Sequence, residues 1–263
     1  MNHVMMLGAI AAPLMAVGAM GAPIVDGFES YGVGGLPGGV WEDIGSRATA
    51  NPGSSPSMSV VETLDAHGVS TNAIQSIGEV GTNGVFAEIE SAEVHRFSVD
   101  IRIDALADPG EGWPMGVGFL NDVGQGDVNQ NPHAVVYAWT NRTWRMYYRP
   151  GEDRPALDVL ISGDRFELGS WYTISMEVDR TIGEFRISIL DALSGEETNS
   201  RTVLASNWDG ERSDFDALGF FDGESGGADS FGQATLDNVR YVPGPGGGVV
   251  MLMSGALLAR RRR

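Results

Sequence analysis

The clearest strand pattern in this chain is Trp171-Tyr-Thr-Ile-Ser-Met-Glu-Val-Asp179, followed after a short turn by Glu184-Phe-Arg-Ile-Ser-Ile-Leu190. Apolar and polar side chains alternate along both runs, which is the period-two pattern of a strand with one buried face. The connecting residues 180–183 end in a glycine and are few enough to join antiparallel neighbours. The two runs therefore predict a β-hairpin with one apolar side.

Other short runs of alternating or β-branched residues lie between clusters of Gly, Asp, Asn and Pro, which is typical of strands joined by turns. Between Asp26 and Tyr241 no segment shows a sustained apolar stripe at helical spacing. The further runs are 85–91, 95–104, 115–120, 134–140, 143–149, 157–162, 201–205, 217–221 and 234–242. So many strands in one domain predict an all-β fold, a two-sheet antiparallel β-sandwich.

Composition agrees with one globular domain. The 263 residues are 42% hydrophobic and 20% charged, with 37 Gly, which favours a turn-rich folded protein over a disordered one. The chain contains no Cys, so disulfides, thiolate metal sites and Cys nucleophiles are excluded.

The charge balance is strongly acidic. The chain has 35 Asp and Glu against 17 basic residues, all of them Arg, and four of these stand at the extreme C-terminus. Without those four, 13 Arg face 35 acids, a formal charge of −22. Such a body repels nucleic acid and anionic membranes, whereas divalent cations and neutral polymers suit it as partners. We therefore expect no nucleic-acid partner, and solubility alone is the plain alternative reading of the charge.

The N-terminal segment predicts export. Residues 4–22, VMMLGAIAAPLMAVGAMGA, form an apolar run that ends in small residues before the first acid, Asp26. This is the pattern of a secretory signal peptide, and it assigns residues 1–22 to a cleaved signal helix. A buried N-terminal helix is the alternative.

The C-terminal segment predicts a membrane-associated tail. Residues 242–248, VPGPGGG, precede the apolar run 249–259 and the four residues Arg260 to Arg263. The run is short for a full span, which needs about 20 residues, so we expect a short apolar helix that anchors transiently with its Arg cluster on the cytoplasmic side. The chain then divides into a signal (1–22), a β-sandwich domain (23–241) and a tail (242–263). A core helix ending in Arg is the alternative.

The tail resembles the PEP-CTERM sorting signals of exosortase-bearing bacteria, which combine a short Pro motif, an apolar helix and a terminal Arg cluster. Gly244 stands where that family usually has Glu. The resemblance covers about the last 22 residues of the chain and implies an exosortase-like processing enzyme as a partner, with the mature protein at the cell surface or outside the cell.

The central hairpin resembles that of concanavalin A-like and laminin G-like jelly rolls. The opening stretch from Asp26 to Tyr31 and the closing stretch from Leu236 to Val239 resemble the paired first and last strands of such domains. In several jelly-roll carbohydrate-binding modules these strands supply ligands to a structural calcium ion, so the resemblance implies Ca²⁺ at Glu29 and Asp237. A hydrogen-bonded pair of carboxylates is the alternative.

No catalytic residues are predicted. Glycosidases on this fold carry paired carboxylates in the pattern E-x-D-x-x-E, because a retaining mechanism needs two of them about 5 to 5.5 Å apart. Glu88 and Glu90 share a strand face but lack the third member. His67, His95 and His133 have no metal-site spacing. Residues 127–131, DVNQN, open like a calcium loop without completing one, so a polar loop is favoured.

The segment 134–149 is the richest in aromatic residues and predicts a second hairpin, turning at Asn141-Arg142. A two-residue turn sets Trp139 opposite Trp144, with Tyr137 facing Met146 and Val135 facing Tyr148, so that one face is aromatic. This face is either part of the core or a platform on which sugar rings stack. We expect the core for at least one of the two Trp, and the candidate ligand-binding residues are Tyr137, Trp139, Trp144 and Tyr148.

Two functions follow. The first is an exported, surface-associated, non-catalytic protein whose jelly roll binds extracellular glycan or matrix polymer. The second is a divergent polysaccharide hydrolase or lyase on the same fold.

Overall fold

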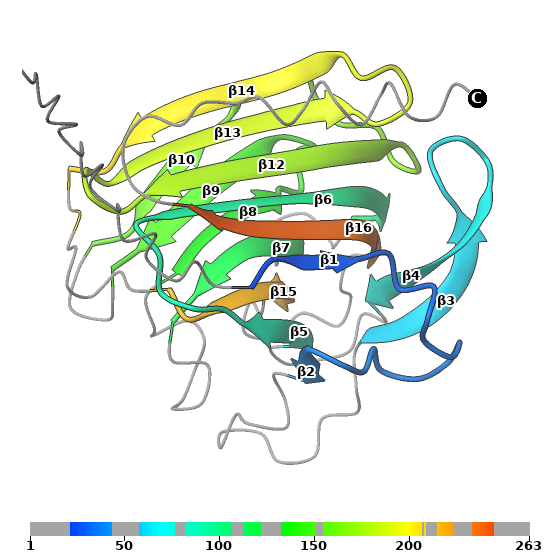
Figure 1. Ribbon diagram of the computed structural model, residues 1–263. Coiled ribbons are helices and arrows are strands. Elements are labelled where there is room, and N and C mark those ends of the chain that lie inside the picture. The colour runs from blue at the N-terminus through cyan, green and yellow to red at the C-terminus, as the bar shows by residue number, and fades with distance from the viewer. Residues whose placement is uncertain are drawn as a thin grey trace, which may run out of the picture.

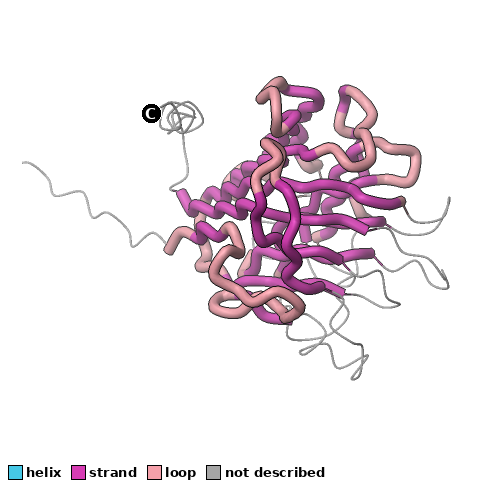
Figure 2. Tube along the Cα trace, turned by 90° about the vertical axis from the view of Figure 1, so that its right-hand side faces the viewer, coloured by secondary structure: helices cyan, strands magenta, loops and turns pink. Residues whose placement is uncertain are grey.

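The computed structural model describes residues 22–43, 58–76, 83–106, 113–121, 133–150, 155–206, 208, 215–223 and 233–244. Within these ranges all regular structure is strand, as Figure 2 shows by colour. None of the described residues belongs to a helix that could cross a membrane. The two helices expected at the ends of the chain lie outside the described residues.

The strands form two antiparallel sheets that face each other (Figure 1). Sheet A has nine strands, and its spatial order is β11 (Ser162–Gly163), β14 (Glu197–Leu204), β13 (Glu184–Asp191), β12 (Trp171–Asp179), β6 (Val94–Ala105), β16 (Gln233–Gly244), β4 (Ser70–Ser76) and β3 (Met58–Leu64), with β1 (Ile24–Asp26) also paired to β16. Sheet B has seven, in the order β10 (Leu157–Leu160), β9 (Trp144–Arg149), β8 (His133–Ala138), β7 (Trp113–Leu120), β15 (Ala217–Gly223), β5 (Asn83–Glu88) and β2 (Trp41–Asp43). The predicted two-sheet antiparallel sandwich is confirmed.

The central hairpin matches the predicted limits to within one residue, since β13 extends to Asp191. Strands β12 and β13 pair from Tyr172 with Asp191 to Asp179 with Glu184. The turn between them closes with a hydrogen bond of 2.9 Å from the Gly183 amide to the Asp179 carbonyl. Gly183 has φ of 67°, a backbone conformation that favours glycine.

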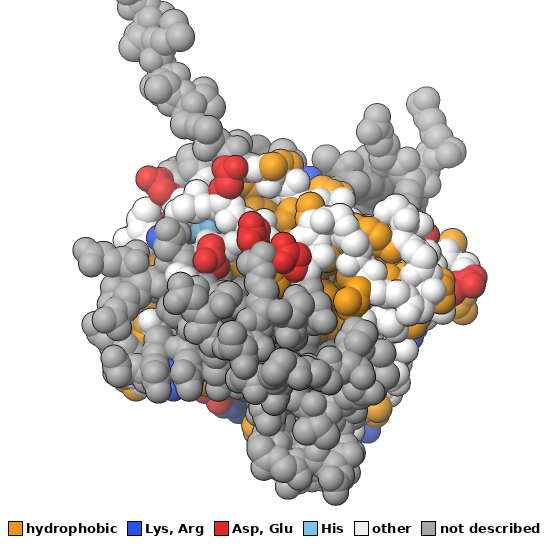
Figure 3. All heavy atoms as spheres, turned by 90° about the horizontal axis from the view of Figure 1, so that it is seen from below, with side chains coloured by type: hydrophobic (Ala, Val, Ile, Leu, Met, Phe, Trp, Pro, Cys, Tyr) orange, Lys and Arg blue, Asp and Glu red, His pale blue; other side chains and the backbone are white. Residues whose placement is uncertain are grey.

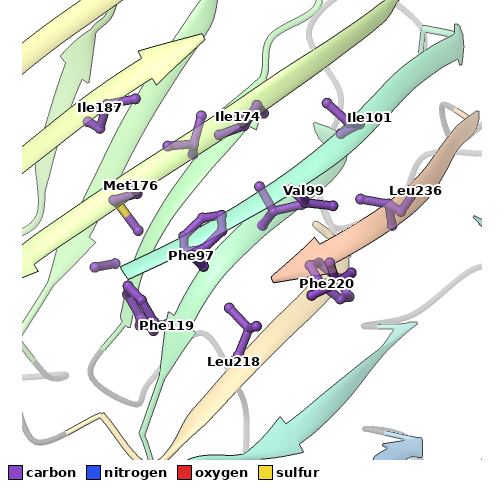
Figure 4. Packing of buried hydrophobic residues seen from close by; sticks show 14 of the residues in the cluster. Phe97, Val99, Ile101, Phe119, Ile174, Met176, Ile187, Leu218, Phe220 and Leu236 are labelled. Carbon is purple, nitrogen blue, oxygen red and sulfur yellow. The ribbon is translucent and has the colours of Figure 1, made fainter. Parts of the chain in front are cut away.

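Alternation along the strands builds the core between the sheets. On β6 the side chains of Phe97, Val99 and Ile101 point inward and are at most 3% exposed. They meet Phe119 and Phe220 from sheet B, as Figure 4 shows. Burial of this continuous apolar layer is the main stabilising contribution to the sandwich.

The sequence pattern misses several strands, and one predicted run divides. β3 and β4 form a hairpin from Met58 paired with Ser76 to Leu64 paired with Ser70. The exposed and half-buried positions of the two strands include Ser, Glu, Thr, Asn and Gln, so the apolar alternation is incomplete. The run 157–162 splits into β10 in sheet B and β11 in sheet A, because the chain changes sheet at the buried Ile161.

Strand β16 pairs with three strands of sheet A: β6, β4 and β1. It pairs with β6 along its length, and a bulge between Asp237 and Arg240 places Asn238 at φ of 51°. Before the bulge it pairs with β4, and after it with β1, where Asp26 lies opposite Val239. The predicted pairing of the first and last strands is confirmed, although the strand ends at Asp26 and residues 27–31 form a turn.

The outer faces of the two sheets differ. Sheet A is polar outside: β6 presents Arg, Ser and Asp side chains in alternation. The outside of sheet B instead carries a second buried apolar cluster of Phe86, Leu120, Val135, Tyr137 and Ala217. In the view from below, acidic side chains gather near the middle of the described surface (Figure 3). Trp139 and Tyr147 pack against this cluster but are only partly buried, so they bring aromatic rings on this face within reach of solvent.

Candidate functional site

The β8–β9 hairpin has a different register from the predicted one. Ala138 lies opposite Trp144, and Tyr137 lies opposite Arg145. The loop has three residues instead of two: the amide of Trp139 donates to the carbonyl of Thr143 at 2.9 Å, and Arg142 takes φ of 65°. A type I turn followed by one left-handed residue is the usual form of a three-residue hairpin loop.

This shift of one residue moves half of the predicted platform into the core, because strand side chains alternate between faces. Trp144 and Tyr148 are both 0% exposed and belong to the main core cluster. The Trp144 ring lies 4.9 Å from that of Phe166, measured between centroids. A single aromatic platform of all four residues is therefore wrong, and the expectation that at least one of the two Trp is a core residue is confirmed.

Tyr137 and Trp139 lie on the outer face of sheet B. Their rings meet edge to face with centroids 5.7 Å apart. Tyr137 is 1% exposed, whereas Trp139 is only partly buried and packs on the same outer cluster. The hairpin thus keeps one aromatic side chain on this face within reach of solvent.

Asp158 on the edge strand β10 organises the polar part of this face. Arg145 donates to it twice, from Nε to Oδ1 at 2.9 Å and from Nη2 to Oδ2 at 3.0 Å. The Tyr137 hydroxyl donates to the same Oδ1 at 2.9 Å. The Arg145 guanidinium also lies 5.9 Å from the centroid of the Trp139 ring. Three strands, β8, β9 and β10, thereby hold one connected polar and aromatic group.

The electrostatics keep the phenol neutral. Burial raises the pKa of Tyr137, and the negative charge of Asp158 raises it further. A neutral hydroxyl already bonded to a carboxylate is a fixed dipole and a poor general base. The arrangement therefore suits recognition by hydrogen bonds and ring stacking.

Neighbouring positions on the same face continue the surface. The ring of His133 stacks on that of Tyr147 at 5.2 Å between centroids. Gly118 pairs with Val135, and a Cβ there would lie 2.1 Å from the Ala134 carbonyl oxygen, so this position needs glycine.

Arg145, Tyr147 and Asp158 were not singled out from the sequence, because only the pairing of β10 with β9 brings Asp158 to the hairpin.

The structure brings the predicted calcium ligands close together on the outer face of sheet A. The Thr71 hydroxyl lies 2.6 Å from Glu29 Oε1 and 3.1 Å from Asp237 Oδ2. The amide of Asn238 donates to Asp237 Oδ1 at 2.7 Å. The two carboxylates therefore flank one hydroxyl at the point where β1, β4 and β16 meet.

A single hydroxyl proton is insufficient for both carboxylates. Thr71 can donate to only one of them, so the other contact requires a protonated carboxyl or a bound cation. Burial raises the pKa of Asp237 to about 6, and the nearby Asp100 and Glu29 raise it as well. Asp100 lies directly opposite Asp237 in the sheet, and burial raises its pKa too. This junction is therefore electrostatically strained when all its acids are ionised.

The donors at the junction are oxygen atoms, which suits a hard cation such as Ca²⁺. Among the described residues, however, no three acidic or His side chains are arranged so as to enclose a metal. Other ligands would have to come from the Thr71 hydroxyl, backbone carbonyls or water.

The remaining candidates are dispersed. Glu88 and Glu90 are both exposed at the end of β5 and beyond it, as expected of a solvated strand face. His95 is buried in the core beside the Tyr241 hydroxyl at 3.0 Å, and His67 is exposed in the β3–β4 turn. The segment 127–131 and both terminal signals lie outside the described residues.

No family model and no curated protein matches this chain. Among solved structures, it is similar to arcelin-5, a lectin-like defense protein from Phaseolus vulgaris, with 11% identity and a TM-score of 0.51 over 86% of this chain and 99% of that one. It is equally similar to an endo-1,3-beta-glucanase from Streptomyces sioyaensis, with 12% identity and a TM-score of 0.51 over 88% of this chain and 99% of that one. The chain therefore has the jelly-roll sandwich fold of a lectin-like protein and of a glucanase. At this identity the comparison shows the fold alone.

Proposed function

We propose that this protein is exported to the cell surface and binds an extracellular glycan or matrix polymer without cleaving it. The observation that carries the proposal is the fixed group of Trp139, Tyr137, Arg145 and Asp158 on the outer face of sheet B. Sugar rings combine apolar C–H faces with hydroxyls, so they match an indole beside paired hydrogen-bonding groups.

The chemistry of this group favours binding over catalysis. Both oxygens of Asp158 accept from Arg145, and Tyr137 shares one of them. The acceptor oxygens of this carboxylate are thus occupied in holding the guanidinium and the phenol in place. The sequence also lacks the paired-carboxylate pattern of glycosidases on this fold.

Replacing Trp139 by Ala tests the site. We expect the affinity for the polymer found on a glycan array to fall at least about tenfold, because the partly exposed ring supplies the stacking surface. The free energy of unfolding should fall by less than about 1.5 kcal/mol. Isothermal titration and urea denaturation of the full-length chain measure the two quantities.

Trp208 provides the matched control, because it is also partly buried but packs on the main core, 5.4 Å from the Tyr148 ring. Trp208→Ala is expected to lower stability and leave the affinity unchanged. Equal affinity of wild type and Trp139→Ala would move the site elsewhere. Release of reducing sugar from the bound polymer would overturn the non-catalytic function in favour of a hydrolase or lyase.

We also propose a structural calcium ion at Glu29 and Asp237. The two carboxylates around the Thr71 hydroxyl and the acidity of the chain support it. An ion that binds only the folded state should raise stability by about 2.7 kcal/mol at a hundredfold excess over Kd. Thermal unfolding with Ca²⁺ and with chelator measures the shift, and Glu29→Ala should abolish it. An unchanged melting temperature would contradict the proposed calcium site.

Export and anchoring make a separate prediction. The apolar run before Asp26 and the tail 242–263 support cleavage at both ends, the second by an exosortase-like enzyme after transient anchoring in the membrane. Intact-mass measurement of native material should therefore find a chain that was cleaved near Ala19 to Ala22 and that lacks Arg260 to Arg263. A secreted form that keeps the four Arg residues would rule out the sorting signal.

A further inference from the structure

A hollow of about 390 Å³ opens on the outer face of sheet A, away from the site on sheet B. Three turns border it: the β3–β4 turn, the residues just before β12 and the β13–β14 turn. Figure 1 shows the β3–β4 hairpin in cyan at the right, its loop rising toward the ends of β12 and β13. The hollow exists because β4 pairs with β16 only at Gln75 and Ile74, which leaves the rest of the hairpin to curl over the sheet.

An indole and a guanidinium belong to the lining. Trp171 and Arg102 are partners across β12 and β6, and the guanidinium carbon lies 4.9 Å from the centroid of the Trp171 ring. The Trp171 Nε1 donates to the Leu64 carbonyl at 3.0 Å, which ties the hairpin to the sheet. The charge of Arg102 is balanced locally, because its Nε donates to Asp104 Oδ1 at 2.6 Å.

Two carboxylates on different turns also line the hollow. Asp65 Oδ1 accepts from the amides of His67 and Val69, each at 2.8 Å. Asp191 Oδ1 accepts from the amides of Leu193 and Ser194, and the Ser194 amide lowers the pKa of Asp191. A side-chain hydrogen bond from Ser194 lowers the pKa of Asp191 further.

The rim of the hollow is apolar. Leu64 is 56% exposed and Leu193 is 66% exposed, and both line it. Large exposed leucines beside two fixed carboxylates and an aromatic floor combine an apolar contact surface with a net negative charge. A hollow of this volume is at the small end of those that hold compact ligands.

We propose that this hollow binds a protonated amino sugar, with the ammonium group held by the carboxylates of Asp65 and Asp191 and the ring against Leu64 and Leu193. An ammonium group satisfies two acceptors of one sign, whereas a uronate or a sulfate would be repelled by them. The inference rests on the proposed glycan binding only for the class of ligand, because it concerns a second site on the opposite sheet.

Titration with a glucosamine tetramer tests the hollow, and its N-acetylated counterpart is the matched neutral ligand. We expect the full-length chain to bind the glucosamine tetramer at least about tenfold more tightly. Asp65→Asn and Asp191→Asn should each lower that affinity at least about fivefold, since each removes one charge but keeps the oxygen that accepts from the turn amides.

Asp179→Asn is the charge-matched control. Its Oδ1 accepts from the Thr181 amide in the same kind of turn, at the other end of β12. This variant should bind as the wild type does, which separates a local contact from the general attraction of an acidic protein for a cation. Equal binding of the two tetramers, or equal losses of affinity in all three Asn variants, would contradict an amino-sugar site in the hollow. If only Trp139→Ala lost binding, the amino-sugar site in the hollow would be contradicted, but the proposed glycan binding on sheet B would still hold. A glycan array on which the protein binds no ligand would count against the proposed glycan binding itself.

Discussion

Replacing Trp144 by Ala should cost about 3 to 5 kcal/mol of folding free energy, the range found when a large buried aromatic is truncated. Trp144 is 0% exposed, and its ring contacts Phe166 and, edge to face, Tyr172. The truncation opens a cavity between the sheets that these rigid rings cannot fill. Urea denaturation gives the loss, and unchanged affinity for the glycan in the remaining folded protein is expected.

A second substitution, Trp144→Phe, keeps the prediction testable even if Trp144→Ala does not fold. The Trp144 Nε1 has no hydrogen-bond partner among the described residues, so Trp144→Phe removes a buried polar group while keeping a ring. We expect it to cost under about 2 kcal/mol. If Trp144→Ala changed stability by less than about 1 kcal/mol and lowered glycan affinity instead, the observed register of the β8–β9 hairpin would be wrong and the two-residue turn right.

The second large expected effect is a dependence of the folding stability on pH, which originates in Asp237. In chelator, the contribution of Asp237 to stability should fall by about 3 kcal/mol as the pH rises from about 4 to above 6. Its carboxyl is 2% exposed, and burial raises its pKa to about 6. A raised folded-state pKa means that the folded protein holds the proton more tightly than the unfolded chain. The favourable contribution is therefore complete below the unfolded pKa and is lost as the pH rises through the folded one.

Asp237→Asn isolates this contribution. The amide keeps an oxygen for the Asn238 N–H and offers Nδ2 to the Thr71 hydroxyl, which then donates to Glu29. The variant should match the wild type near pH 4 and exceed it by about 3 kcal/mol near pH 7. A difference between the two proteins that does not change with pH would contradict the burial of an uncompensated charge.

Calcium should reverse this comparison. If the ion lies at Glu29 and Asp237, its addition at pH 7 stabilises the wild type and leaves Asp237→Asn unaffected, since the variant lacks a charged ligand. Asp100→Asn separates the two causes of strain at the junction. It removes the opposing charge and should lower the pKa of Asp237 without removing either proposed ligand.

The local sequence pattern was sufficient to predict much of the sandwich. The alternation of 171–179 and 184–190 determined the β12–β13 hairpin, because a strand with one buried face must repeat every two residues. The same reasoning located most of sheet B. The pairing of the first strand with the last, and the choice of Glu29 and Asp237, came from the resemblance to jelly-roll domains, and the fold places these two carboxylates around one hydroxyl.

What the pattern left open depended on contacts between distant segments. Whether the aromatic hairpin turned over two residues or three was decided by the left-handed Arg142 and by which aromatic rings the core between the sheets accepts. One residue of register moved Trp144 and Tyr148 inside and left Tyr137 and Trp139 outside. The partners Asp158 and Arg145, the shared proton at Thr71 and the hollow beside Trp171 arise only from strand order, because each joins residues that lie on different strands or turns. Alternation in a sequence specifies which side chains share a face, but only the packed sheets determine which face lies inside and which residues meet across it.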